Sequence, residues 1–201
     1  MRQALIIFIR NPVPGEVKTR LSKSIGDHKA LEVYKLLLKH TQTITRGLSC
    51  DKFLYYSGDP NLNDLWDNKL YIKKKQHPGP FGEKMMHAFR ELFDKGYEHL
   101  VIIGSDCLEL DEAQIQKAFQ SLLEKQIVIG PATDGGYYLL GMNSLHPELF
   151  VNKQWSSETV YEDTLADINA AGLTVTILPQ LNDIDEEADL PASMVQQLEG
   201  I

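Results

Sequence analysis

The stretch from Leu100 to Leu110, LVIIGSDCLEL, constrains the fold of this 201-residue chain more than any other. Its first four residues are all apolar, which is typical of a strand buried on both faces of a parallel sheet. Gly104 then permits a tight turn. Ser105 and Asp106 follow at the carboxyl end of the strand, where open α/β sheets form their ligand crevice. We therefore expect an α/β protein with a ligand site at this sheet edge.

A second segment, GPATDGGYY from Gly130 to Tyr138, predicts the opposite wall of the same crevice. It follows a short apolar run that reads as another buried strand. Asp134, Gly135 and Gly136 form its centre. Two glycines after an aspartate are compatible with a plain turn, and they also let backbone N–H groups approach a ligand closely. The position after a neighbouring strand favours ligand binding.

The order of the remaining elements predicts one α/β domain over residues 1–201, with a mostly parallel sheet covered by helices. This length permits a hydrophobic core without disulfides or a structural metal. Apolar patterns and breaker residues predict strands over residues 4–9, 53–56, 70–72, 100–103, 127–129, 137–142 and 173–178. Helices are expected over residues 27–46, 62–66, 83–95, 111–123, 156–171 and 186–198, with Asp111 as an N-cap.

Cations follow the first predicted strand. The loop NPVPGEVKTRLS contains two prolines that prevent regular structure at its start, and it carries Lys18 and Arg20. Such residues usually form a solvated surface, but a strand-end loop faces the expected crevice, which favours contact with an anionic ligand. Lys84 lies in the first turn of a helix that follows Gly82, where free N–H groups could also bind a phosphate. An ordinary helix start explains Lys84 equally well.

The charge balance excludes some classes of partner. Lysine and arginine number 20 against 28 aspartates and glutamates, a net charge of −8, which argues against binding nucleic acid or anionic membranes. Cys50 and Cys107 lack metal-type spacing and indicate reduced thiols in a cytoplasmic protein. Cys107 beside Asp106 could be a nucleophile, but packing is the preferred interpretation. No apolar run has the length of a signal core or a membrane span.

The strand-end groups together predict a phosphorylated ligand and a divalent metal, Mg²⁺ or Mn²⁺. Mg²⁺ needs only one or two protein carboxylates, because phosphates and water complete its octahedron. Asp106 is one candidate ligand. Asp185, in the segment NDIDEE, is the second, although the acids there could instead serve the start of the last helix. The sequence contains no zinc pattern, Ser–His–Asp signature, P-loop or GxGxxG fingerprint.

Five segments taken together resemble a known family: NPVPGEVKTRL, FGEKM, GSDC, GPATDGGYYLLG and NDIDEEADL. In this order they resemble DUF2064, an uncharacterised bacterial family of the nucleotide-diphospho-sugar transferase superfamily. More distantly they resemble the guanylyltransferases of molybdenum-cofactor and coenzyme F420 synthesis. The resemblance implies a three-layer α/β/α sandwich of the glycosyltransferase A type. It also implies a nucleotide at the carboxyl ends of the N-terminal strands and a divalent metal on the aspartate of GSDC.

The resemblance assigns roles to individual residues. Lys18 and Arg20 match the cations that hold nucleotide phosphates, and with the metal aspartate Asp106 they form the expected catalytic set. The turn of residues 134–136 matches the acceptor side. The nucleotide or substrate contacts expected in full are Lys18, Arg20, Lys84, Ser105, Asp134, Gly135 and Gly136, with Asp106 and Asp185 on the metal.

Two departures from the relatives bear on the activity. The chain has Asp106-Cys107-Leu108 where glycosyltransferases have Asp-x-Asp, and a proline-rich first loop where sugar-nucleotide pyrophosphorylases have a glycine-rich one. The preferred hypothesis is a metal-dependent nucleotidyltransferase that joins an NTP to a small phosphorylated acceptor. The alternatives are a glycosyltransferase using an NDP-sugar and a non-catalytic nucleotide-binding module. A pure binding module has no need to gather Asp106 and two cations at one edge.

Overall fold

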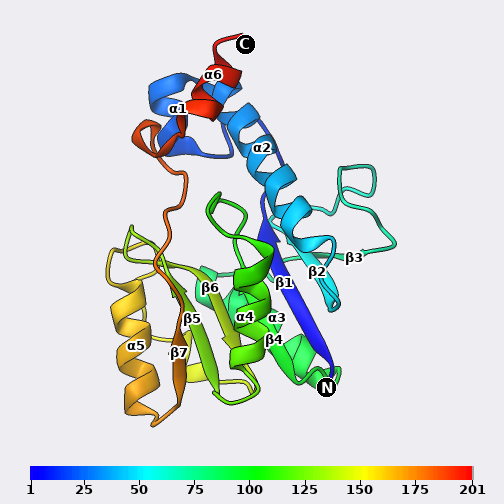
Figure 1. Cartoon of the computed structure of the whole chain (residues 1–201), viewed down its shortest axis with the longest axis vertical. Helices are drawn as coiled ribbons and strands as arrows, with labels where there is room; N and C mark the ends of the chain where they lie inside the picture. The colour runs from blue at the N-terminus through cyan, green and yellow to red at the C-terminus, as the bar shows by residue number, and fades with distance from the viewer. Residues whose placement is uncertain (201) are drawn as a thin grey trace.

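A single seven-stranded sheet forms the centre of the computed structural model, which describes residues 1–200 (Figure 1). Its strand order is β3-β2-β1-β4-β6-β5-β7, and β6 is the one strand of residues 1–200 that runs antiparallel to its neighbours. The carboxyl ends of the other strands therefore share one edge. The strands are β1 (Gln3–Ile9), β2 (Asp51–Tyr56), β3 (Tyr71–Lys75), β4 (His99–Ile103), β5 (Ile127–Pro131), β6 (Tyr137–Met142) and β7 (Val175–Ile177).

Helices cover both faces of the sheet and confirm the expected three-layer α/β/α sandwich (Figure 1). The helices α2 and α4 pack on one face, and α3 and α5 pack on the other. None of the helices in residues 1–200 combines the length and apolar character needed to cross a bilayer. The helices are α1 (Thr19–Ile25), α2 (Asp27–Thr45), α3 (Phe81–Asp94), α4 (Glu112–Ser121), α5 (Val160–Ala170) and α6 (Ala192–Leu198), with short 3₁₀ turns at Pro147–Leu149 and Glu187–Asp189.

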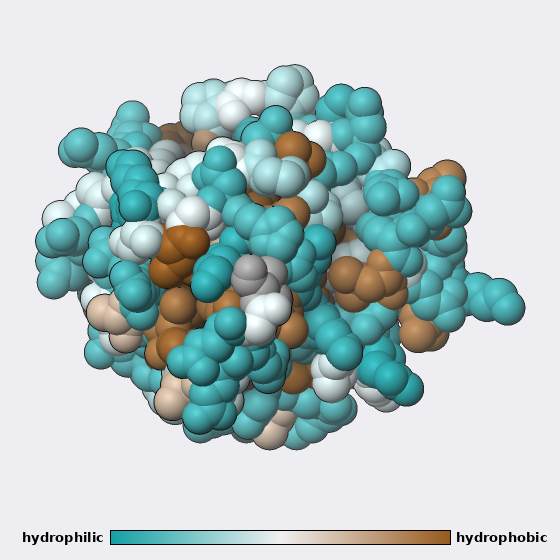
Figure 2. All heavy atoms as spheres, turned by 90° about the horizontal axis from the view of Figure 1, so that it is seen from above, coloured by the Kyte–Doolittle hydropathy of each residue, from teal (hydrophilic) through white to brown (hydrophobic). Residues whose placement is uncertain are grey.

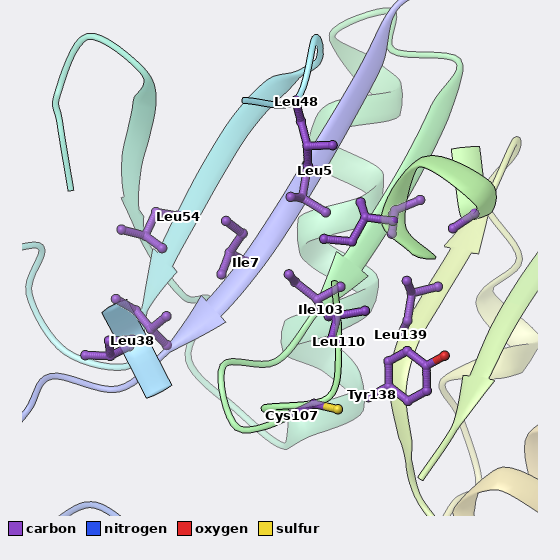
Figure 3. Close-up of a cluster of buried hydrophobic side chains, with 14 of the residues drawn as sticks. Leu5, Ile7, Leu38, Leu48, Leu54, Ile103, Cys107, Leu110, Tyr138 and Leu139 are labelled. Atoms are coloured by element: carbon purple, nitrogen blue, oxygen red, sulfur yellow. The ribbon is translucent and has the colours of Figure 1, made fainter. Parts of the chain in front are cut away.

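The two-faced burial of the central strands explains their continuous apolar sequences. In β1, Leu5 and Ile7 pack toward α2 and α4, whereas Ile6 and Phe8 pack toward α3. Figure 3 shows Leu5 and Ile7 facing the first of these clusters, with Ile103 of β4 beside them. Burying a large apolar side chain stabilises a fold by about 1.5–3 kcal/mol. The buried strands therefore hold the carboxyl edge of the sheet in a fixed position.

A third apolar cluster lies beyond the carboxyl edge of the sheet. Leu21 of α1, Leu37 of α2 and Met194 of α6 pack together with Ile184. After β7 the chain continues past the carboxyl edge of the sheet to α1 and α6 (Figure 1). Seen from this end, the surface is mostly hydrophilic with small apolar patches (Figure 2). The cluster therefore brings the C-terminal segment to the first loop, at the edge where a ligand site was expected.

Several predicted elements differ in the structure. The helix expected over residues 62–66 is wrong: this segment forms turns, and Trp66 packs edge-on against Tyr71 with ring centroids 4.9 Å apart. The last helix is broken, because Pro191 separates the 3₁₀ turn from α6. Gly82 lies inside α3 rather than before it, since the helix begins at Phe81.

Two further helices differ from the expectation. The helix α1 was not predicted: it begins at Thr19, so Arg20 is helical where a loop was expected. α5 begins only at Val160 with Thr159 at its N-cap, because Ser156 has a φ of 68° and cannot continue a right-handed helix. The Asp111 N-cap of α4 is confirmed: its side chain accepts a hydrogen bond from the Gln114 backbone N–H in a capping box.

Candidate functional site

A buried ion-pair cluster centred on Lys18 lies at the carboxyl edge of the sheet. The Lys18 Nζ atom is 3.0 Å from Asp106 Oδ2 and 2.9 Å from Asp185 Oδ1. The Lys18 side chain is only 5 % exposed, whereas Asp106 and Asp185 are 42 % and 34 % exposed. The structure thus joins three predicted site residues that are far apart in the chain. They come from the loop after β1, the loop after β4 and the segment after β7.

Local backbone structure holds these three residues in place. Lys18 precedes α1 with a φ of 46° and a ψ of 48°, a left-handed conformation that costs a residue with a side chain about 1–2 kcal/mol. The Asp106 carbonyl accepts a hydrogen bond from the Ile184 N–H at 3.0 Å, which ties the last segment to the loop after β4. The Asp189 carboxylate accepts hydrogen bonds from the backbone N–H groups of Asp185 and Glu186 at 3.0 and 2.7 Å. The carboxylates therefore sit on a backbone that other contacts fix.

The ion pairs of the cluster shift the pKa values of Lys18 and Asp106. Desolvation would raise the pKa of Asp106, but the neighbouring Lys18 ammonium outweighs it and holds that pKa below its usual range. Burial would lower the pKa of Lys18, and the charges of Asp106 and Asp185 instead raise it above the ordinary value. At neutral pH Lys18 is therefore an ammonium and Asp106 an ionised carboxylate.

Asp183 is a further carboxylate of this site that the sequence analysis did not single out. Its Oδ1 atom is buried and has no hydrogen-bond partner among residues 1–200. Burial, followed by the charges of Asp106 and Asp134, raises the pKa of Asp183 to about 8. A signal was present, because Asp183 and Asp185 alternate around Ile184, which is 4 % exposed. In an extended segment this alternation places both carboxylates on the side opposite the buried residue.

The raised pKa of Asp183 predicts a pH-dependent cost of folding. Between about pH 4 and pH 8 the folded chain binds more protons at this carboxyl than the unfolded chain does, so stability falls as pH rises and levels off above. Asp183→Asn removes this pH dependence, because asparagine does not titrate. In urea unfolding with EDTA, we expect the free energy of unfolding of the variant, minus that of the wild type, to increase from about pH 5 to about pH 9. The control is Glu187→Gln at an exposed acid nearby, and an equal difference for Asp183→Asn at both pH values would contradict the prediction.

The other predicted ligand residues are less tightly joined to the cluster. Arg20 Nη1 lies 3.7 Å from Asp185 Oδ2, and its side chain is 60 % exposed and open to a ligand. Ser105 is buried, with its hydroxyl 3.4 Å from the Tyr34 hydroxyl, which gives it a packing contact inside the protein. Lys84 lies on α3, and no hydrogen bond or ion pair within residues 1–200 joins its side chain to Lys18 or its partners.

The turn of residues 134–136 packs against the segment that leads into α5. Asp134 Oδ1 accepts a hydrogen bond from the Gly136 N–H at 2.8 Å. Gly135 has a φ of 86°, and a Cβ atom there would lie 1.9 Å from the Glu158 carbonyl oxygen. The Gly135 carbonyl also accepts a hydrogen bond from the Tyr161 N–H at 2.8 Å. Glycine is therefore required at position 135 for close packing of the backbone, whatever the turn binds.

The position of Cys107 agrees with a packing role. Its side chain is 7 % exposed and belongs to the cluster beneath α2 and α4, as Figure 3 shows. The Sγ atom donates to the Asn182 carbonyl at 3.6 Å. Burial raises the pKa of the thiol well above its ordinary value, so the thiolate that a nucleophile needs is disfavoured.

The residues of the cluster fit a divalent cation with oxygen ligands. Within residues 1–200, no three His, Cys, Asp or Glu side chains already form a complete metal-binding group. Mg²⁺ needs only one or two carboxylates, however, and Asp106 and Asp185 converge on one cation position that Lys18 occupies. The buried Asp183 Oδ1 atom, which has no hydrogen-bond partner in residues 1–200, offers a further oxygen ligand in the same cluster.

Comparison with solved structures places this fold among transferases. A protein of Desulfovibrio desulfuricans G20, provisionally assigned as a nucleotide-diphospho-sugar transferase, is 29% identical, with a TM-score of 0.88 over 100% of this chain and 96% of its own. The inositol-1-phosphate CTP transferase of T. maritima is 16% identical, with a TM-score of 0.55 over 99% and 95%. Glucosyl-3-phosphoglycerate synthase of Mycobacterium tuberculosis, solved with Mn²⁺ and UDP, is 11% identical, with a TM-score of 0.51 over 99% and 76%.

The first similarity extends to the sequence, and the other two show the shared fold. No curated protein matches the chain. A family profile described as "Uncharacterized protein conserved in bacteria (DUF2064)" matches residues 41–157, which include Asp106 and the turn of residues 134–136. Lys18 and Asp185 lie outside the matched range. Because the match covers more than half of its length, the chain belongs to the DUF2064 family of proteins conserved in bacteria.

Proposed function

We propose that the chain is a metal-dependent nucleotidyltransferase that joins an NTP to a small phosphorylated acceptor and releases pyrophosphate. The observation that carries this proposal is the buried Lys18 ammonium held between Asp106 and Asp185 at the carboxyl ends of β1 and β4. A pyrophosphate leaving group needs positive charge where the nucleotide phosphates lie. Open α/β sheets bind their ligands beyond the carboxyl ends of the strands, and Lys18 follows the carboxyl end of β1.

Each residue of the cluster has a role in this proposal. Lys18 and the exposed Arg20 hold the phosphates of the nucleotide, and Asp106 and Asp185 hold the metal ion. A bound Mg²⁺ or Mn²⁺ supplies charge neutralisation for the leaving group. Asp189 and the Ile184–Asp106 backbone hydrogen bond position the carboxylates before any ligand arrives.

A second candidate is a glycosyltransferase that uses an NDP-sugar. It is favoured by the 29% identity with the D. desulfuricans protein, whose provisional assignment is to nucleotide-diphospho-sugar transferases. The absence of an Asp-x-Asp sequence at Asp106 counts against it, because Leu108 supplies no second carboxylate. In the present proposal Asp185, whose Oδ1 atom lies 2.9 Å from Lys18 Nζ, would have to supply that second carboxylate.

One set of reactions separates the candidates. The full chain is incubated with Mg²⁺ and each of CTP, GTP, UTP and ATP, together with a pool of phosphorylated sugars, and pyrophosphate release is measured. Parallel reactions contain UDP-, GDP- and CMP-linked sugars, and release of the nucleoside phosphate is measured. Pyrophosphate formed from one NTP supports the first candidate, and nucleoside phosphate formed only from a sugar nucleotide supports the second. Nucleotide binding without either product would favour a binding module.

Arg20→Ala tests the phosphate contact without disturbing the fold. Because hydrogen bonds to charged groups contribute about 1.5–3 kcal/mol, we expect nucleotide affinity to fall roughly 10- to 150-fold. The free energy of unfolding should change by less than about 1 kcal/mol, since the ion pair with Asp185 is exposed. Titration calorimetry and urea unfolding measure the two quantities.

The matched control is Lys23→Ala, which removes an exposed positive charge from the same helix. It should leave nucleotide affinity nearly unchanged. If Arg20→Ala and Lys23→Ala bind the nucleotide equally well, Arg20 does not contact the phosphates.

A further inference from the structure

The Lys18 ammonium occupies the position between the two carboxylates that the proposed function assigns to a metal ion. Its Nζ atom lies 3.0 Å from Asp106 Oδ2 and 2.9 Å from Asp185 Oδ1. A cation bound to the same two oxygens would lie close to a like charge and be repelled by it. Lys18 and the ion therefore compete for the two carboxylates.

We propose that Lys18 is a displaceable internal cation: it blocks the carboxylate pair while the site is empty, and it leaves that pair for the nucleotide phosphates when a divalent ion binds. This inference rests on the proposed function, because it concerns the same metal and the same phosphates. It adds that metal binding to the chain alone is weak, and that the metal and the nucleotide favour each other.

The local structure supports a residue that moves between two positions. Lys18 holds a left-handed backbone conformation between an irregular loop and α1, and such strain is found at switch segments. Its side chain has three donors, of which two are engaged by Asp106 and Asp185. Arg20, in the first turn of α1, is exposed beside Asp185, where incoming phosphates would meet its positive charge.

The cluster contains more oxygen acceptors than Lys18 satisfies. Lys18 is bonded to one oxygen of Asp106 and one of Asp185, and Asp183 has a buried oxygen without a partner in residues 1–200. When Lys18 is replaced by a neutral side chain, no ammonium competes with the ion for Asp106 and Asp185. The backbone hydrogen bonds that hold these two residues in place remain. A divalent ion should then bind more tightly, not less.

The test is Mn²⁺ binding to the full chain without nucleotide, followed by the loss of the free Mn²⁺ signal in electron paramagnetic resonance. We expect Lys18→Met to bind Mn²⁺ at least about tenfold more tightly than the wild type, because the competing hydrogen-bonded ammonium is gone. Lys23→Met, which removes one exposed positive charge from α1, should bind like the wild type. Adding Asp106→Asn to Lys18→Met should abolish the gain, which would place the ion at Asp106.

The outcomes separate this inference from the proposed function. Equal Mn²⁺ affinity in the wild type and in Lys18→Met overturns the inference alone. Absence of Mn²⁺ binding from both proteins, with and without added CTP or UDP, overturns the metal assignment and the inference with it.

A crystal of the wild type soaked in Mn²⁺ gives a second test that does not depend on the folding of the variant. We expect anomalous density at Asp106 and Asp185 with the Lys18 Nζ atom withdrawn from at least one of them. Density there with both Lys18 hydrogen bonds retained would overturn the proposal.

Discussion

Asp106→Asn is expected to lower turnover by at least about a hundredfold, the usual scale for removing one group that stabilises charge in a transition state. The variant loses the ionised oxygen that faces Lys18 at 3.0 Å and that is proposed to hold the metal ion. The chain should stay folded, because asparagine still accepts a hydrogen bond from Lys18 and Asp185 keeps its own. Pyrophosphate release measures turnover, and circular dichroism measures folding.

The matched control for this variant is Asp94→Asn, at an exposed carboxylate at the end of α3. It makes the same chemical change far from the carboxyl edge and should retain full turnover. A folded Asp106→Asn protein with undiminished turnover would remove Asp106 from the proposed chemistry.

Gly135→Ala is expected to destabilise the chain by about 2–4 kcal/mol. The φ of 86° costs an alanine about 1–2 kcal/mol, and the Cβ atom would lie 1.9 Å from the Glu158 carbonyl oxygen, so backbone must move as well. For a chain of this size the melting temperature should fall by roughly 4–16 °C. Calorimetry or thermal unfolding followed by circular dichroism measures the change.

Gly136→Ala is the matched control for this prediction. At position 136 a Cβ atom would meet the Asp134 Oδ1 atom at 3.1 Å, a side chain that can move, and the backbone has no left-handed φ. The loss of stability should therefore be much smaller than for Gly135→Ala. Equal melting temperatures for the two variants would show that the close packing at Gly135 is not needed.

The buried parts of the fold were the most predictable from sequence. The apolar runs that became β1, β4 and β6 have few alternative structures in a chain of this length, because burial on both faces requires uninterrupted apolar residues. The Asp111 cap was predictable because it depends on local hydrogen bonds. The antiparallel direction of β6 was also readable, because only residues 132–136 connect it to β5, and a parallel neighbour would need a crossover of a dozen or more residues.

Errors were concentrated where tertiary contacts override local pattern. Residues 62–66 have helical spacing, but Trp66 is buried against Tyr71 in a turn structure. The placement of Lys18 and Asp106 at one sheet edge followed from the rule that parallel strands share a carboxyl edge, although their ion pair was not predicted. That Lys18 would occupy the carboxylate pair itself, and that Asp183 would be left unpartnered, depends on the path of the segment after β7. No local sequence pattern predicts the path of that segment.

Metal-dependent binding of an NTP is tested most directly by a thermal-shift measurement on the full chain with CTP, GTP, UTP and ATP, each with and without Mg²⁺. A ligand at a hundredfold its dissociation constant stabilises by roughly 2.7 kcal/mol, which for this size corresponds to a rise of roughly 5–10 °C. We expect such a rise for at least one NTP only when Mg²⁺ is present, and we expect Asp106→Asn to lose it. A rise that is independent of Mg²⁺ and unchanged in Asp106→Asn would contradict this prediction.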